Sequence, residues 1–243
     1  TGLAAHGEPA AAALGALLEV VERDAFIVAW EGGAVFEACD PMSHPEAAVR
    51  ALVEAERAAG HVLHLARVPS APGVAVFAAT SVARVPSPAV PAHAVGLGAH
   101  VNVAAAARSA LLEATQVRYA LARRLVSLAA RARMAALGAG AAVVDPIDHG
   151  LWAAHPASGA AVARLCRGAA RRLPGGEEVG VTAALAALGA VFAGRPAAVV
   201  EVTPPTLAAE GWTVARAVWP GGRRISPGPA SAGARERRPH PFC

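Results

Sequence analysis

The sequence predicts an α/β or α+β domain in which helices and strands alternate along one chain. Alanine-rich stretches with helical spacing are mixed with short apolar runs of strand length, and no internal repeat is present. Hydrophobic residues make up 55% of the 243 positions and charged residues 16%, which is enough apolar material for a packed core. We therefore expect mixed β-sheets flanked by helices.

The first half of the chain predicts two helices followed by strands. Residues 9–30 begin with a proline suited to a first helical turn, and their leucines, valines and Phe26 recur at near-helical spacing. A cap at residues 43–46 starts a second helix that Gly60 ends. The remaining elements expected here are a hairpin of strands at 61–68 and 73–81, a loop at 85–92, a strand at 94–101 and a long helix at 103–137.

The second half has weaker patterns. Residues 145–157 show little periodicity and are expected to be irregular, and the chain from residue 220 onward is rich in glycine, proline and arginine. The elements expected between them are helices at 160–172 and 181–192, a buried strand at 197–203, a helical turn from Pro204 and a last strand at 213–219.

Composition argues against several classes of function. The net charge is +4, but the arginines are dispersed, so we expect no nucleic-acid partner. Cys39, Cys166 and Cys243 have no metal-site or disulfide spacing, which favours the cytoplasm. The uncharged apolar run at 179–194 is too short for a membrane span, and no signal peptide is recognised. The chain lacks an initiator methionine, and we interpret it as a fragment or a processed chain.

Two helices carry acids at a spacing that predicts a shared face. Glu19 and Glu22 are at positions i and i+3 among leucines and valines, and Glu113 and Gln116 repeat the arrangement. Adjacent carboxylates repel each other unless a cation or a proton lies between them. Magnesium, a hard cation that takes oxygen ligands, is one candidate for that cation.

If the two helices pack together, an oxygen-rich magnesium site results, at which Arg23 and Arg118 could hold phosphate oxygens. The alternative is that these acids form solvated surface pairs or helix caps. A Walker phosphate loop cannot occur, because the chain contains no lysine.

Other candidates have less support. His61 and His64 form a close pair of histidines on an expected strand, and no HExxH or GxSxG motif occurs. Thr1 could in principle be an N-terminal nucleophile. Asp148 and His149 follow Asp145 in the stretch expected to be irregular, where a turn-forming role is favoured over catalysis.

Several short motifs, taken in order, resemble those of the YcaO family. They are residues 1–5 (TGLAA), 18–25 (LEVVERDA), 112–118 (LEATQVR), 148–152 (DHGLW), 200–205 (VEVTPP) with 214–221, and 239–243 (PHPFC). The resemblance spans essentially the whole chain. It implies a single YcaO-like domain over residues 1–243, lacking the N-terminal portion of the family, with residues 221–243 as a Pro/Gly/Arg-rich tail.

The resemblance also implies an activity. YcaO enzymes use ATP and Mg²⁺ to phosphorylate a backbone amide of a ribosomally made precursor peptide, giving azoline rings from Cys, Ser or Thr. By this likeness Glu19, Glu22 and Glu113 match the magnesium-binding acids. Gln116, Arg23 and Arg118 match residues beside the nucleotide. Pro239 and Pro241 match a tail that orders the catalytic pocket.

The resemblance further implies a separate leader-peptide-binding partner and leaves a homodimer open. Three departures bear on activity rather than fold. The family's N-terminal portion, which includes a Ser-x-x-x-Glu nucleotide motif, is missing from this sequence. The stretch from Gly221 to Arg238 is short, and Cys243 stands where the family favours proline. The alternatives are therefore a thioamide-forming YcaO enzyme and a non-catalytic scaffold subunit of a peptide-modifying complex.

Overall fold

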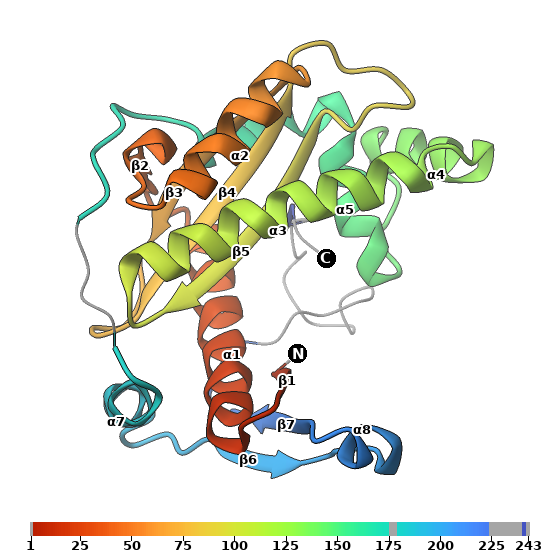
Figure 1. Cartoon of the computed structure of the whole chain (residues 1–243). Coiled ribbons are helices and arrows are strands. Elements are labelled where there is room, and N and C mark those ends of the chain that lie inside the picture. The colour runs from red at the N-terminus through yellow and green to blue at the C-terminus, as the bar shows by residue number, and fades with distance from the viewer. Residues whose placement is uncertain (1, 175–178, 224–239, 242–243) are drawn as a thin grey trace.

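The computed structural model describes residues 2–174, 179–223 and 240–241, which form two antiparallel sheets joined by helices (Figure 1). The strands are β1 (Leu3–His6), β2 (Glu37–Cys39), β3 (His61–Val68), β4 (Ala75–Ala83), β5 (His93–His100), β6 (Ala198–Glu201) and β7 (Thr213–Val218). The helices are α1 (Pro9–Glu31), α2 (Ala47–Ala58), α3 (Val103–Arg124), α4 (Leu128–Gly138), α5 (Pro146–Ala154), α6 (Gly159–Val162), α7 (Val181–Val191) and α8 (Pro205–Ala209). Three 3₁₀ turns occur at Pro41–Ser43, Pro156–Ser158 and Ala163–Leu165.

The larger sheet has the strand order β2-β3-β4-β5 and is covered on both faces. Alternate residues point to opposite faces of a strand. Phe77 of β4 thus packs with α2 and α3, whereas Val76 packs with α1 and with residues of α7. In this sheet β5 is an end strand, so one of its edges has no strand beside it.

Two glycines let α3 lie directly on β5. A Cβ added at Gly96 would be 2.1 Å from the backbone nitrogen of Ala114, and one at Gly98 would be 2.2 Å from the carbonyl oxygen of Ala106. Glycine inside a strand marks such a close approach of backbones. The contact brings the middle of α3, including Glu113, against the edge strand.

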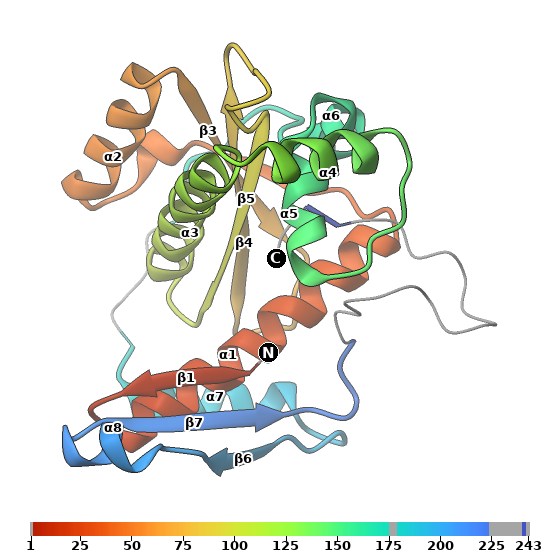
Figure 2. The same ribbon diagram turned by 90° about the vertical axis from the view of Figure 1, so that its right-hand side faces the viewer.

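The smaller sheet, β1-β7-β6, packs on the first half of α1 (Figure 2). Ala12 and Ala16 of α1 meet Ala215 and Ala217 of β7. The second half of α1 reaches the larger sheet through residues such as Phe26. The long helix α1 thus packs against both sheets. Between its contacts with one sheet and with the other, it passes the free edge of β5.

The α+β class is confirmed, and most expected elements form close to the expected bounds. The hairpin pairs His61 with Ala83 and Val68 with Val76 in the antiparallel sense. Strands β1 and β2 were not foreseen, because three or four residues give too short a pattern to recognise. No helix in the described part of the chain is both long and apolar enough to pass through a membrane.

Four expectations were wrong. The strand expected to be buried at 197–203 forms as β6, but all four of its residues are exposed, because β6 is an end strand of the smaller sheet.

The other three errors concern helices. The helix expected at 103–137 breaks after Arg124 into α3 and α4; Arg131 Nε donates to Leu125 O at 2.6 Å, and the bend lets α4 pack on α5. Residues 145–157 are not irregular, because Asp145 caps α5 and proline occupies its first turn. The helix expected at 160–172 ends early, and Arg171 instead bridges to the edge of β2 at Cys39.

Candidate nucleotide and metal site

Carboxylates from two helices meet at the free edge of β5. Glu113 of α3 accepts a hydrogen bond from the Leu97 N–H, with 2.6 Å between Oε2 and N. Glu22 of α1 accepts one from the Ala99 N–H. Residues two apart in a strand direct their N–H groups to the same edge. The edge strand therefore holds both carboxylates side by side, one from each face of the sheet.

Glu19 and Arg23 extend this cluster along α1. Arg23 Nε lies 3.0 Å from Glu19 Oε1, an i,i+4 ion pair. The other oxygen of Glu19, Oε2, accepts the N–H of Leu3 at 2.9 Å, which ties the helix to β1. The acidic cluster, defined as Glu19, Glu22, Arg23 and Glu113, thus contains three carboxylates and one guanidinium.

Repulsion and burial raise the pKa values of the two carboxyls at the edge. The pKa of Glu22 rises from 4.5 to about 8, chiefly through loss of solvent, then through the charge of Glu113; Arg23 opposes the shift. The pKa of Glu113 is also raised chiefly by loss of solvent, and the hydrogen bond from Leu97 limits the rise. Both groups would be stabilised as anions by an added cation.

The donor set fits a magnesium–nucleotide complex better than a free-standing metal centre. Within the described residues, no group of three or more His, Cys, Asp or Glu side chains is arranged to hold a metal ion unaided. Magnesium bound with a nucleotide takes only one or two protein carboxylates, and phosphate oxygens and water complete its shell. Glu22 and Glu113, which are coupled through their charges, supply such a pair.

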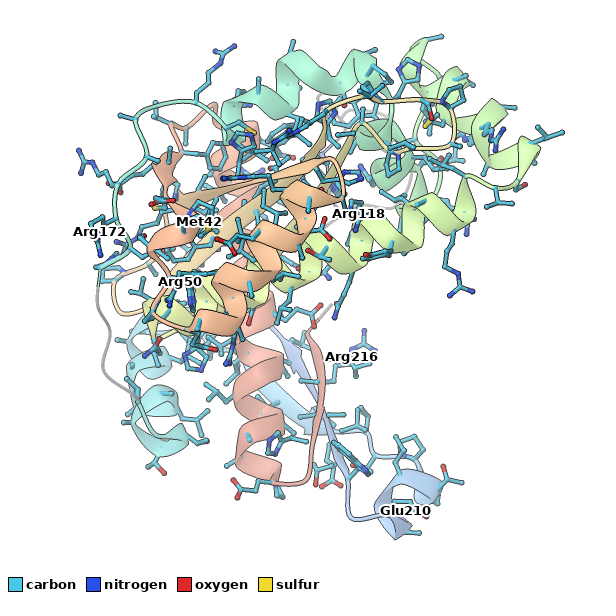
Figure 3. All side chains as sticks on the ribbon, turned by 45° about the horizontal axis from the view of Figure 1, so that its top comes forward. Met42, Arg50, Arg118, Arg172, Glu210 and Arg216 are labelled. Atoms are coloured by element: carbon cyan, nitrogen blue, oxygen red, sulfur yellow. The ribbon has the colours of Figure 1, made fainter. Side chains whose placement is uncertain are left out.

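The other residues expected beside the nucleotide are placed differently. Gln116 is exposed on α3, one turn after Glu113. Arg118 is buried where α2 crosses α3 (Figure 3), and it donates to Glu56 through Nε at 2.8 Å and Nη2 at 2.7 Å. A phosphate could recruit Arg118 only by opening this ion pair, so its role at the nucleotide stays a prediction.

The motif at 148–152 lies on α5, and the end of the chain contacts it. Asp148 accepts hydrogen bonds from Arg133, and His149 stacks on His240 with 3.6 Å between ring centroids. Pro241 is buried beside this contact. Pro239 lies outside the described residues. The sequence identified this motif but not its helix or its partner in the tail.

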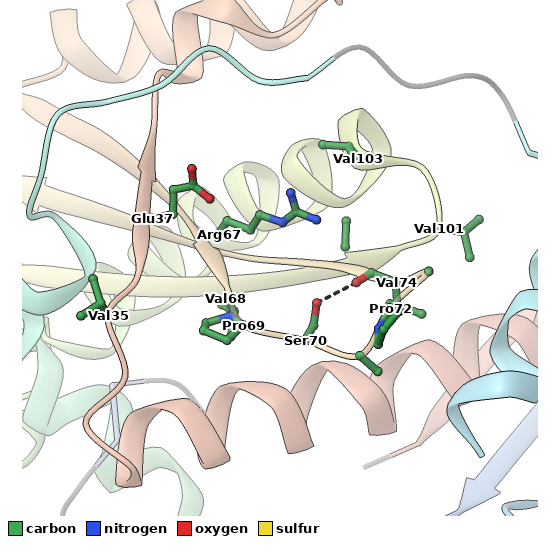
Figure 4. Close-up of a pocket in the computed structure, with 13 residues that line it drawn as sticks. Val35, Glu37, Arg67, Val68, Pro69, Ser70, Pro72, Val74, Val101 and Val103 are labelled. Carbon is green, nitrogen blue, oxygen red and sulfur yellow. Dashed lines mark hydrogen bonds between the residues drawn. The ribbon is translucent and has the colours of Figure 1, made fainter. Parts of the chain in front are cut away.

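A cavity of about 480 Å³ opens at the end of the β3–β4 hairpin (Figure 4). Arg67 and Glu37 point into it beside several valines, and Ser70 Oγ donates to the Val74 carbonyl at 2.7 Å across its floor. None of the residues predicted for the nucleotide site lines this cavity.

Sequence reasoning missed the part of the site formed by the β5 backbone. The N–H groups of Leu97 and Ala99 hold the two carboxylates, and a backbone donor leaves no residue signature. A usable signal did exist, because Gly96 and Gly98 interrupt an apolar strand, and glycines there indicate that another backbone approaches closely.

The fold and the acidic cluster define an α+β domain that gathers helix-borne acids at the edge of β5 and has no Walker loop. The family model for "YcaO cyclodehydratase", described as ATP- and Mg²⁺-binding, matches residues 1–223. The chain belongs to the YcaO family, and the resemblance inferred from its motifs is confirmed. No curated protein matches the sequence.

Solved structures agree on the fold. The heterocyclase TruD matches 93% of this chain at 21% identity with a TM-score of 0.66. YcaO from Methanopyrus kandleri, bound with AMPPCP and Mg²⁺, matches 91% at 19% identity with a TM-score of 0.63. The microcin synthetase complex McbBCD of E. coli, with pro-MccB17 bound, matches 91% at 14% identity with a TM-score of 0.62. This chain spans 29% of the length of TruD and 54% of each of the other two.

Proposed function

We propose that this chain provides the nucleotide-binding part of a YcaO cyclodehydratase, which activates a backbone amide of a precursor peptide with ATP and Mg²⁺. One observation carries the proposal: Glu22 and Glu113 are held together at the β5 edge with raised pKa values. Bringing like charges together is costly unless a cation joins them, and the family is ATP- and Mg²⁺-binding.

In this reaction a Cys, Ser or Thr side chain of the peptide attacks the preceding carbonyl carbon and loses its proton. The former amide oxygen accepts the γ-phosphoryl group and ADP leaves. Departure of that oxygen with phosphate, and loss of the amide proton, leave the carbon–nitrogen double bond of an azoline. The net change in the peptide is the loss of one water.

The residues of this chain would act by binding and positioning. Glu22 and Glu113 would hold the magnesium ion, which would supply a positive charge beside the transferring phosphoryl group, and Glu19 remains a proposed third magnesium-binding acid. Arg23 is the positively charged residue of the acidic cluster, and we propose that its guanidinium binds phosphate oxygens of the nucleotide. Gln116 and Arg118 remain proposed nucleotide neighbours, and Pro239 and Pro241 remain proposed for the catalytic pocket.

The proposal includes a ribosomally made precursor peptide, a leader-binding partner protein, a single domain over residues 1–243 and a cytoplasmic setting. The E. coli complex with pro-MccB17 bound supports the first two by likeness of fold. A thioamide product would use the same phosphorylation with a sulfide donor, and a scaffold subunit would need no nucleotide.

Calorimetric titration of the chain with Mg-ATP tests the proposal. We expect saturable binding that the double variant Glu19→Gln, Glu22→Gln loses at least 100-fold. The variant Glu54→Gln, Glu210→Gln removes the same charge from exposed positions and should bind as the parent does. Absence of binding to the parent chain would contradict an enzymatic role and leave the scaffold alternative.

A further inference from the structure

The described parts of the C-terminal tail are fastened to the body at two separated places. At its start, the Arg223 N–H donates to Asp24 Oδ1 at 2.6 Å, and Arg223 Nη1 lies 3.1 Å from Glu31 Oε2. Both acids belong to α1, one immediately after Arg23 of the acidic cluster. Near its end, the tail contacts α5 through His240.

The contact at α5 is a buried stack of two imidazoles. The centroids of the His149 and His240 rings lie 3.6 Å apart, the rings are 9° from parallel, and the two residues are only 5% and 6% exposed. The His240 N–H also donates to His149 Nδ1 at 3.3 Å. Nδ1 of His149 is the acceptor of this bond, so the ring holds the tail backbone as well as the tail side chain.

His149 is presented by a helix that is itself firmly held. Asp148, the preceding residue, accepts the Arg133 Nε–H at 2.8 Å and the Val144 N–H at 2.9 Å. At the other end of α5, the Ala154 carbonyl accepts the Ala92 N–H at 2.8 Å, just before β5 begins. The receptor for the tail is thus fixed to the strand whose free edge carries the acidic cluster.

Catalysis by His149 itself is disfavoured by this geometry. One face of its ring is covered by His240, its Nδ1 is occupied, and 5% exposure leaves little access for a peptide. A group acting directly on the substrate would have to reach the reacting atoms. The arrangement suits a residue that holds another segment in place.

We propose that His149 is a positioning residue that docks the tail at His240–Pro241 on α5, the helix that is joined to the start of β5. Docking itself is a property of this fold, but its effect on turnover rests on the function proposed above. The ring stack and the accepted hydrogen bond both contribute, so removing both should release the tail while the nucleotide site stays intact.

Amide exchange of His240 in the full chain measures docking. Labelling with ¹⁵N-histidine gives nine backbone amide signals, and Pro239 and Pro241 contribute none. We expect His149→Ala to speed exchange of the His240 amide at least tenfold. His149→Phe keeps the stack and His149→Gln keeps an acceptor, and each should fall between the parent and the alanine variant. His155→Asn, at the end of the same helix, keeps the acceptor for Ala157 N–H and should match the parent.

Steady-state turnover of Mg-ATP distinguishes a positioning role of His149 from a purely structural role. His149→Ala should lower kcat at least tenfold with KM for Mg-ATP within twofold, and His149→Phe should recover part of the loss. Exchange at His240 within twofold of the parent in His149→Ala would overturn the docking. Faster exchange with unchanged kcat would overturn the positioning role. A parent chain that neither binds nor turns over Mg-ATP refutes the proposed function and, with it, the positioning role, whereas the exchange result still decides the docking.

Discussion

Two sets of acids in this molecule have opposite electrostatic surroundings. Glu56 of α2 is 3% exposed and receives two hydrogen bonds from Arg118, so its charge is matched within the fold. Glu22 and Glu113 at the β5 edge lie together, and the charge of Glu113 raises the pKa of Glu22. Arg23, which offsets part of this charge, is already paired with Glu19.

This difference in pairing distinguishes an acid that stabilises the fold from acids that are suited to bind a cation. An acid with a bidentate arginine partner has no need of another cation, and disrupting it leaves a buried charge unpaired. Acids that gather with like charge, each fixed by a backbone N–H, carry a cost that a bound cation would remove. The comparison predicts that variants of the first set harm folding and variants of the second harm binding.

The largest expected effect on stability is at the matched pair. Glu56→Gln leaves Arg118 buried without its counter-charge and should lower the free energy of unfolding by about 3–5 kcal/mol. Urea denaturation of the variant and the parent measures this loss of unfolding free energy. Mg-ATP affinity, corrected for the folded fraction, should stay within threefold, because the acidic cluster is unchanged; a larger change would support the proposed place of Arg118 beside the nucleotide. The joint variant Glu56→Leu, Arg118→Met should recover most of the stability. A Glu56→Gln protein as stable as the parent would contradict the structural role assigned to the Glu56–Arg118 pair.

The next effect tests how the acids are brought together. Gly98→Ala places a Cβ against the backbone of α3, which must shift, at a cost of about 1–3 kcal/mol in unfolding free energy. The shift moves Glu113 away from Leu97, so Mg-ATP binding should weaken about tenfold or more. Gly189→Ala on α7, where a Cβ meets nothing within 4 Å, is the matched control and should stabilise slightly.

The pH dependence of stability follows from the raised pKa of Glu22. Between pH 4.5 and about 8 the folded state holds a proton that the unfolded state has lost, so the free energy of unfolding should fall as pH rises through this window. We expect a loss of about 1–3 kcal/mol from this carboxyl, measured by urea denaturation across the range. Glu22→Gln should flatten the curve. An unchanged slope in the variant would show that Glu22 titrates normally.

The smallest effect belongs to a third kind of acid, one paired at the surface. Glu46 and Arg108 lie 3.3 Å apart with side chains 42% and 45% exposed. Glu46→Gln should change the unfolding free energy by less than about 0.5 kcal/mol, because solvent screens the pair. A thermal melt compared with the parent detects this, and a large loss would mean that exposure does not predict the importance of a pair.

The sequence predicted the helices and the acid spacing but not how the acids pair. Glu19, Glu22 and Glu113 are recognisable because helical periodicity and family motifs are local properties of the chain. Arg118 was grouped with them by its place in the same motif, whereas its partner Glu56 lies 62 residues away and only packing brings them together. The β5 backbone donors and the His149–His240 stack are likewise long-range contacts, which no local pattern encodes.

The break between α3 and α4 shows the same limit. The alanine-rich sequence on both sides of Leu125 favours a single helix that continues through this residue, and no proline or glycine marks the turn. The chain bends because α4 gains contacts with α5, a tertiary effect that overrides helix propensity. By contrast, α5 was missed although its signals were local, namely Asp145 followed by proline.

The most direct test of the acidic cluster is the number of protons released when Mg-ATP binds. Calorimetry at pH 7 in buffers of different ionisation enthalpy gives this number. With a pKa of about 8, Glu22 is about 90% protonated before binding, so a cation that binds the carboxylate should release about 0.9 proton per site. Glu22→Gln should release none from this position. Tight Mg-ATP binding to the parent chain without proton release would contradict the assignment of Glu22 as a protonated carboxyl that loses its proton when it binds the cation.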